Sequence, residues 1–499
     1  MVVLENILYR LREHPPRYGP EWGSGGVFGL KYYRDVLYYT LAFEAESHFI
    51  TSDRNAVYKF ELVGDKPVSG GDTYNAVEVV DDNIYFGGWV HAPAVYKGRS
   101  GKGSTISFVN KYSHVHVYDV SSGSIKLLWK EGVGDEYKWA GEVSDIIYDP
   151  VNDRLLLARG DGHVNLGIYS LDRRSGRVEK LSENPVLKGS HYLDHICFGI
   201  HSYPWGVRGV ECIDLVEGRR VVKWFRDLDR VSIDGDTVYT PCVGVASSGY
   251  GRFLLFVKGG LFIGNPVDED IEPLRFVRLF DFVKNLYGPL RTMVKPFGGG
   301  FLVAYNSYVH SFLHPLEDSV EKGFERKIVN TVVGPSVLVY ITPPTARIVG
   351  VYGARITGFE RVGDRLVIAY NTMANLGERD ASPIDNGYRG FIIESMDILY
   401  RNPPPITFKI PGYIVEDKTF GGIPLTGYRE PELRIWLSKD NGLYINSYDL
   451  GLPLNRAYST VYDLKKGFNK ISLRDYRDSI ISLRFEKPDV DALVKINLL

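Results

Sequence analysis

The chain has 499 residues, enough for about two to four average domains or one large β domain with a smaller one. Its composition, 44% hydrophobic and 24% charged, is that of a folded globular protein with a full core. The formal net charge of −2 gives no global electrostatic support for nucleic acid or an anionic membrane surface. We expect neither as a partner.

The first predicted element is an amphipathic helix at residues 4–14, because its leucine and isoleucine residues recur at helical spacing. Pro15 and Pro16 end it. The segment carries Glu5 and lacks a small-residue cleavage site, so it does not resemble a signal peptide. No stretch approaches the roughly 18 apolar residues of a membrane span. We therefore expect a cytoplasmic protein.

One pattern then recurs along the chain: an apolar strand, a tight polar turn, and a second apolar strand that ends in small or polar residues. The copies are VFGLKYYRDVLYYTLAF (from Val27), NAVEVVDDNIYFGGW (from Asn75), VSDIIYDPVNDRLLLARGD (from Val143), RVSIDGDTVYTPC (from Arg230), MVKPFGGGFLVAYN (from Met293) and RITGFERVGDRLVIAYN (from Arg355). Residues 195–215 form a looser seventh copy. Repetition at this period is typical of units that bury their faces against one another.

Further strand pairs lie between these hairpins. They are HVHVYDVSSGSIKLLWK, NLGIYSLDRRSGRVEKL and VECIDLVEGRRVVKW, each alternating around a turn that contains Gly. An inner and an outer hairpin together make four antiparallel strands. The pattern therefore predicts an all-β protein with a six- or seven-bladed β-propeller. A set of stacked β-sandwiches is the alternative, which we favour less because sandwiches need not repeat one inner hairpin so regularly.

A domain boundary is predicted at Pro403, Pro404 and Pro405, because three consecutive prolines cannot join a ladder. We therefore divide the chain into a helix and lead-in (1–29), a propeller (30–400) and a small C-terminal β-sandwich-like domain (406–499). A final blade that extends past the prolines is the alternative. In the tail the inward candidates are Ile471, Leu473, Ile480, Leu483 and Phe485.

The three cysteines are Cys197, Cys212 and Cys242, and none has CxxC spacing. Cys197 and Cys212 could face each other across a hairpin, but we favour buried free thiols. Few Cys and Met residues together with abundant Tyr, Arg, Lys and Glu would suit a thermophile.

Polar residues recur where second strands end and where first strands begin, and in a propeller these positions converge on one mouth of the central channel. Those that end second strands are Glu46, His48, His91, Asp161, His163, Asn165, Asn306 and Asn371. Those that begin first strands are Asn75, Glu142, Asp145, His195, Arg291 and Arg355.

Carboxylate and imidazole groups in this set are suitable ligands for a divalent cation, Ca, Mn or Zn. We predict Glu142, Asp161 and His163 as its ligands. Arg291 and Arg355 would hold a carboxylate or phosphate of a ligand, and in an enzyme Glu142 and His163 would join them as catalytic groups. The predicted binding residues are Glu46, His48, His91, Asn165 and His195. A structural role is the alternative for each, because polar groups at blade ends also satisfy backbone groups.

The phrases GGWVHAP (from Gly87) and ARGDGHVNLGIY (from Ala158), with the hairpins of residues 30–400, resemble a group of archaeal β-propeller-like proteins of unknown function. They are broadly similar to lactonase-like and WD-repeat-like propellers, although no blade ends in Trp-Asp with its Gly-His partner. The resemblance implies a propeller fold and transfers no active site.

Two functions stay open. The first is a soluble binding or scaffold protein that presents its channel mouth and C-terminal domain to a protein or glycan partner. It is favoured because GRSGKGST lacks the spacing of a phosphate loop and no GxSxG occurs. The alternative is a metal-dependent propeller hydrolase or lyase that acts on a lactone, a sugar acid or another small anionic substrate.

Overall fold

The computed structural model describes most of the chain. The described residues are 2–15, 26–42, 46–60, 70–72, 75–91, 111–133, 141–160, 165–202, 206–225, 245–283, 287–289, 292–307, 334–372, 388–455 and 457–499. Within these ranges no helix is long and apolar enough to cross a membrane.

Strands between Val27 and Ser395 form seven antiparallel sheets in the described ranges, and each sheet uses strands that are consecutive in the chain. The first three sheets contain β1 (Val27–Tyr33), β2 (Val36–Leu41), β3 (Glu46–Ile50) and β4 (Asn55–Lys59); β5 (Gly70–Asp72), β6 (Val77–Val80), β7 (Asn83–His91), β8 (Lys111–Asp119) and β9 (Ile125–Val133); and β10 (Val143–Asp149), β11 (Arg154–Gly160), β12 (Asn165–Asp172) and β13 (Val178–Ser182).

The next four sheets have the same order. They contain β14 (Val186–Tyr192), β15 (His195–Ser202), β16 (Gly206–Asp214) and β17 (Arg220–Trp224); β18 (Val245–Gly249), β19 (Arg252–Val257), β20 (Gly260–Gly264) and β21 (Arg275–Arg278); β22 (Val294–Phe297), β23 (Gly300–Tyr305), β24 (Ser336–Thr342) and β25 (Thr345–Tyr352); and β26 (Arg355–Val362), β27 (Arg365–Asn371) and β28 (Arg389–Ser395), which the 3-10 helix η4 (Met396–Leu399) follows.

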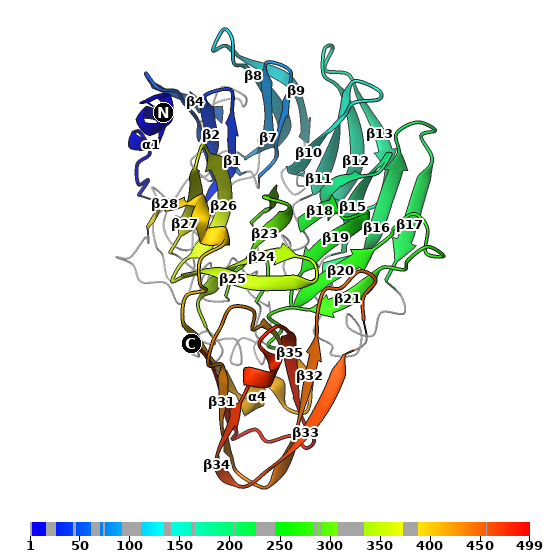
Figure 1. The fold of residues 1–499 in the computed structure, drawn as a ribbon. Helices are drawn as coiled ribbons and strands as arrows, with labels where there is room; N and C mark the ends of the chain where they lie inside the picture. The colour runs from blue at the N-terminus through cyan, green and yellow to red at the C-terminus, as the bar shows by residue number, and fades with distance from the viewer. Residues whose placement is uncertain are drawn as a thin grey trace, which may run out of the picture.

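The sheets are arranged radially (Figure 1). We call the innermost strand of each sheet its first strand: β1, β6, β10, β14, β18, β22 and β26. First strands of neighbouring sheets contact one another: β1 and β6, β6 and β10, β10 and β14, β14 and β18, and β18 and β22. The last sheet then contacts the first through β26 and β1. This radial packing is that of a β-propeller. It confirms the predicted all-β propeller and removes the alternative of stacked sandwiches.

The N-terminal segment packs where the last sheet meets the first. α1 (Val2–Tyr9) is shorter than the predicted helix of residues 4–14. The reason is that His14 N–H donates instead to Arg389 O on β28 (3.0 Å), while the Arg10 guanidinium donates to Ser52 O (3.1 Å). Ile7 is fully buried in a cluster with residues of both sheets, including Leu37 and Val367. The segment therefore seals the junction that closes the ring.

Most predicted hairpins are confirmed: the copies that start at Val27, Asn75, Val143, Met293 and Arg355 are the inner pairs β1–β2, β6–β7, β10–β11, β22–β23 and β26–β27. The copy from Arg230 lies outside the described residues. Residues 195–215 form the second and third strands of their sheet, because the inner pair there is β14–β15. The inner hairpin β18–β19 was not predicted. Its second strand is followed at once by a tight turn at Gly259 that leads into β20, whereas the second strands of the other sheets are followed by longer connections.

Cys197 and Cys212 form a disulfide across β15 and β16. Our preference for free thiols was wrong. The two residues are direct partners in the antiparallel register, with Cα atoms 4.0 Å apart, so the strand pairing itself brings their side chains together on one face.

The C-terminal residues form two further four-stranded sheets. One has the order β29 (Ile406–Pro411), β36 (Leu493–Leu498), β31 (Glu432–Leu437) and β34 (Gly467–Ser472). The other has the order β30 (Phe420–Pro424), β35 (Ile480–Phe485), β32 (Asn441–Tyr448) and β33 (Tyr458–Leu464). The short helices α4 (Gly412–Val415) and η5 (Arg474–Tyr476) lie in their connections. All five predicted inward residues of the tail are buried.

These two sheets pack against the propeller rather than standing apart from it (Figure 1). β30 contacts β21 and β25, and Asp281 N–H donates to Gly421 O (2.7 Å). Phe408 packs against Phe280 and Phe282, with ring centroids 6.0 and 5.5 Å away. One continuous hydrophobic core therefore joins the C-terminal sheets to the fifth and sixth propeller sheets.

Ile7→Ala tests the closure of the ring. We expect the free energy of unfolding to fall by about 2–4 kcal/mol, because the substitution leaves a cavity between the first and last sheets. Urea denaturation followed by circular dichroism measures it. Val2→Ala, at a side chain that is 69% exposed in the same helix, should change stability by less than about 0.5 kcal/mol. Equal stability of the two variants would contradict a sealing role for α1.

Candidate functional site

Six of the seven first strands each place one ionisable residue near the propeller axis, and we call this set the axial charge ring. Its members are Lys31 (β1), Glu78 (β6), Asp145 (β10), Lys188 (β14), Lys295 (β22) and Glu360 (β26). β18, which is described in full, carries Ser247 and Ser248 and no ionisable residue. Three cations and three carboxylates therefore face one another from different sheets.

The members of the ring interact across the boundaries between sheets. Lys295 Nζ lies 2.7 Å from Glu360 Oε2, and Lys188 Nζ lies 3.8 Å from Asp145 Oδ1. The four side chains are only 11–17% exposed. Lys31 interacts electrostatically with Lys295, Glu78 and Glu360. The ring is thus largely buried and internally compensated, as buried charges must be.

Burial perturbs the titration of two members. Desolvation raises the pKa of Asp145 to about 6, the positive charge of Lys188 and the Gly189 N–H hydrogen bond oppose this shift, and Glu78 adds to it. Desolvation lowers the pKa of Lys31, and the nearby Lys295 lowers it further. Perturbed groups of this kind cluster at functional sites, although structural networks perturb pKa values too.

β-bulges recur in the inner hairpins next to the ring. The register shifts between Phe28 and Lys31, Val143 and Asp145, Val186 and Gly189, and Ile356 and Gly358. Each bulge interrupts the ladder and leaves backbone groups without a strand partner.

Side chains from adjoining sheets satisfy the backbone at these bulges. Asn75 Oδ1 accepts from Gly29 N–H (2.7 Å), Asp145 Oδ2 accepts from Gly189 N–H (2.8 Å), and Asn306 Oδ1 accepts from Ile356 N–H (2.8 Å). The Lys188 ammonium donates to Ser144 O. Asn75, Asp145 and Asn306 thus have the structural role that was the alternative to ligand binding.

Two predicted residues lie where first strands begin. Glu142 directly precedes β10 and Arg355 opens β26, and both are buried. The Arg355 guanidinium lies 5.9 Å from the ring centroid of Phe28 on β1, so it contributes to the contact between the last and first sheets.

Glu46 and His48 lie on β3, the third strand of its sheet, rather than at the end of the second strand as predicted. The His48 ring stacks on Tyr39 with centroids 4.7 Å apart and lies 5.0 Å from the His14 ring. Glu46 Oε2 is 3.7 Å from His48 Nε2. These residues form a buried cluster with the N-terminal segment, which separates them from the axial charge ring.

His195 begins the second strand of the fourth sheet, since β14 is the first. It therefore lies at the turn end of the inner hairpin, opposite to the end where Val186 enters. His195 Nδ1 is 2.6 Å from Asp194 Oδ1, and Nε2 is 3.9 Å from Asp214 Oδ2. These contacts fix the turn.

The other predicted residues are only partly covered by the structure. Asp161, His163 and Arg291 lie outside the described residues, and the side chains of His91 and Asn165, at the ends of β7 and β12, do as well. Among the described residues no three His, Cys, Asp or Glu side chains are placed to hold a metal ion. The metal site of Glu142, Asp161 and His163 stays a prediction.

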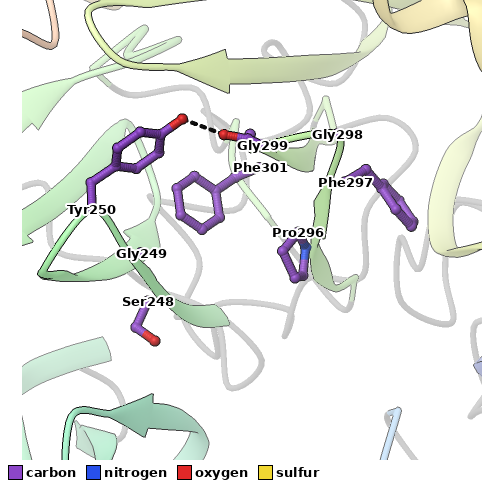
Figure 2. A pocket seen from close by; sticks show the side chains of 9 residues that line it. Ser248, Gly249, Tyr250, Pro296, Phe297, Gly298, Gly299 and Phe301 are labelled. Carbon is purple, nitrogen blue, oxygen red and sulfur yellow. Dashed lines mark hydrogen bonds between the residues drawn. The ribbon is translucent and has the colours of Figure 1, made fainter.

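A groove of about 470 Å³ lies at the turn end of the fifth and sixth sheets (Figure 2). Tyr250, Pro296, Phe297 and Phe301 line it together with glycines 298–300. The Tyr250 hydroxyl donates to Gly299 O across its rim. The groove contains no residue predicted from the sequence and no carboxylate, imidazole or ammonium group.

Sequence reasoning missed most of the axial charge ring. The signal was present: each of the six first strands contains a charged residue within the strand, as in GLKYY, VEVV, SDII, LKGS, VKPF and GFERV. The predicted site residues lie at strand ends, where loops usually carry function, whereas the ring residues lie within the strands.

The radial sheets define the class of this protein as a β-propeller. The chain belongs to the family described as an uncharacterized protein conserved in archaea (DUF2139), whose model matches residues 37–379. The match runs from β2 to the residues after β27, and it leaves out β1, β28 and the C-terminal sheets. The expected resemblance to archaeal propeller proteins is confirmed.

Two solved propellers are similar to this chain at low identity. The β-propeller domain of the trilobed protease from Pyrococcus furiosus is 11% identical, with a TM-score of 0.36, over 76% of this chain and 98% of that domain. The PQQ-bound aldose sugar dehydrogenase from Streptomyces coelicolor is 10% identical, with a TM-score of 0.34, over 77% of this chain and 98% of that one. No curated protein matches the chain. These similarities assign no function.

Asp145→Asn tests the electrostatics of the ring. Because burial raises the pKa of Asp145 from 3.8 to about 6, the folded protein keeps a proton that the unfolded chain releases in this window. The wild type therefore loses stability as the pH rises through it. We expect the stability of Asp145→Asn relative to the wild type to increase by on the order of 1–3 kcal/mol between pH 4 and pH 7.

Urea denaturation at the two pH values measures this difference. Asp270→Asn, at an exposed carboxylate, should show no such change. Lys188→Met should raise the pKa of Asp145 further, since Lys188 is the charge that opposes the shift. A pH-independent difference between wild type and Asp145→Asn would show that the carboxyl titrates normally.

Proposed function

We propose that this protein is a binding protein that presents a seven-bladed propeller and a C-terminal β domain packed against it to a protein or glycan partner. The seven radial sheets support seven blades in residues 30–400, and the two sheets after Pro405 support a sandwich-like domain in residues 406–499. We expect the N-terminal residues 1–29 to serve as the lead-in that closes the ring.

The observation that carries this proposal is a pair of exposed aromatic rings on the C-terminal domain. Trp436 is 38% exposed and Phe468 is 55% exposed, with ring centroids 5.0 Å apart. Single exposed apolar residues are ordinary, but neighbouring aromatic rings on one face are typical of a recognition surface. The domain is held rigidly by its shared core with the propeller, so the surface has a fixed orientation.

Three predicted binding residues and Asp145, all of which the structure describes, lie in separate surroundings rather than in one site. Glu46 and His48 pack beside the N-terminal segment, His195 pairs with aspartates at a turn, and Asp145 pairs with Lys188. They do not converge, and a nucleophile or general base needs its partners within hydrogen-bond reach of one substrate position.

Location and temperature range stay predictions. A disulfide is typical of oxidising compartments, and intracellular proteins of hyperthermophiles are the known exception. The Cys197–Cys212 disulfide is therefore compatible with the predicted cytoplasmic location if the source is a thermophile.

Replacement of both exposed aromatic residues tests the binding function. The full chain and the Trp436→Ala, Phe468→Ala double variant would be applied to an array of neutral and charged glycans. We expect the double variant to lose binding at least tenfold, because the two rings supply most of the apolar contact area. Tyr458→Ala, at an 80% exposed side chain of the other sheet, should bind as the wild type does. Unchanged binding by the double variant would reject this surface.

A metal-dependent hydrolase or lyase is the second candidate. The axial charge ring contains two groups whose pKa values are perturbed, Asp145 with a pKa near 6 and Lys31 with a lowered pKa, and such groups cluster at functional sites. In that case Glu142, Asp161 and His163 would hold the cation, and Arg291 and Arg355 the anion of the substrate.

Elemental analysis by mass spectrometry tests the enzyme hypothesis on protein purified without chelator or affinity metal. A stoichiometric Ca, Mn or Zn that is lost from the Glu142→Ala, His163→Ala double variant would support it. Metal retained by the variant would place the ion elsewhere. Protein without metal would reject the metal-dependent mechanism.

A further inference from the structure

The outward face of the sheet β29-β36-β31-β34 is organised in three rows that cross all four strands, and we call it the outer face. The strand register defines the rows: Thr407, Asn497, Glu432 and Ser472; then Lys409, Lys495, Arg434 and Lys470; then Pro411, Leu493, Trp436 and Phe468. The intervening residues, such as Phe408, Ile435 and Val494, point into the core. The rows are therefore polar, basic and apolar in turn.

The middle row places four cations directly beside one another. Lys409 pairs with Lys495, Lys495 with Arg434, and Arg434 with Lys470. With strands about 4.8 Å apart, the row spans about 14 Å. Like charges directly opposite each other destabilise a sheet, so folding alone does not favour this arrangement. A ligand with several negative charges would favour it, because it would neutralise the row of cations.

One carboxylate organises two of these cations. Glu432 Oε1 accepts from Arg434 Nε (2.6 Å), and Glu432 Oε2 lies 2.8 Å from Lys470 Nζ. Hydrogen bonds from Lys470, Asn497 and Arg434 lower the pKa of Glu432. Arg434 and Lys470 stay 46% and 56% exposed. Four cations against one carboxylate leave the outer face basic in a chain whose net charge is −2.

The apolar row lies beside the basic row and completes the surface. Trp436 and Phe468 are neighbours on adjacent strands, with their planes tilted by 50°. Lys495 Nζ lies 5.3 Å from the centroid of the Trp436 ring. A ligand that follows the rows would therefore meet aromatic rings on one side and ammonium and guanidinium groups on the other.

We propose that the outer face binds a linear polysaccharide that carries carboxylates, a polyuronate. This rests on the proposed binding function and names its partner class. Each uronate unit has an apolar C–H face that can pack on Trp436 and Phe468 and a carboxylate that Arg434 or a lysine can bind through charge-assisted hydrogen bonds. A row of four cations fits an oligomer rather than a single sugar.

The observations favour a glycan over nucleic acid or protein. Successive bases stack on flat ring faces, whereas the planes of Trp436 and Phe468 are tilted by 50° to each other and form an uneven surface that suits a non-planar sugar ring better than a flat base. The cores of protein interfaces are depleted in charge, whereas here the central row is the charged one.

Binding of the full chain to immobilised polygalacturonate tests this proposal. We expect Arg434→Gln, Lys470→Gln to weaken binding at least tenfold. Lys439→Gln, Lys466→Gln, an equal charge change at exposed turn residues of the same domain, should weaken it less than twofold. Lys409→Gln, Lys495→Gln provides a second variant that leaves Glu432, Arg434 and Lys470 in place. Affinity should fall as salt is raised, since exposed charges are screened.

Three comparison polymers give outcomes that would overturn the proposal. If methyl-esterified polygalacturonate bound as tightly as polygalacturonate, recognition of carboxylates would be rejected. If the Trp436→Ala, Phe468→Ala double variant then failed to bind the esterified polymer, the proposed binding function would still hold. Equal binding of polyglutamate would show a general polyanion site, and tighter binding of an oligothymidylate would make nucleic acid the occupant. If none of these polymers binds, the glycan partner is rejected altogether.

Discussion

The structure depends on the contact between its last and first sheets. A four-stranded sheet of this size cannot bury both faces alone, so each blade is stable only against two neighbours. Five of the six consecutive junctions are made by first strands that touch directly, whereas β26 must reach β1 across more than 300 residues of chain. The N-terminal segment stabilises this contact, because Ile7 is buried in the junction and His14 N–H donates to Arg389 O on β28. In this way a local segment offsets part of the entropic cost of a long closure.

The polar interior of the propeller follows from the same closure. Strands that converge on an axis cannot keep regular pairing, and bulges in four inner hairpins provide the extra twist. The freed backbone groups require partners, and Asn75, Asp145, Lys188 and Asn306 supply them from adjoining sheets. Polar residues near the axis thus hold neighbouring sheets in register. That role accounts for the recurrence of polar residues at these positions.

Much of the fold could be predicted from the sequence, because each hairpin is local and its alternation and turn residues lie within about 20 positions. The inner pairs from Val27, Asn75, Val143, Met293 and Arg355 were predicted for this reason. The candidate site could not be predicted as well. Glu46 and His195 were expected at one mouth, but β3 is a third strand and His195 starts a second strand. Strand rank within a sheet depends on tertiary pairing, which alternation does not encode.

In the C-terminal domain the pairing of distant strands was even harder to predict from the sequence. A β domain and five of its inward residues were predicted, but β31 and β32 are neighbours in sequence and belong to different sheets, and β29 pairs with β36 at the far end of the chain. Lys409, Arg434, Lys470 and Lys495 look like scattered surface charges in the sequence and become one row only through this non-local pairing. A net charge of −2 therefore says little about partners, because recognition depends on the field above a local surface and not on the sum over the chain.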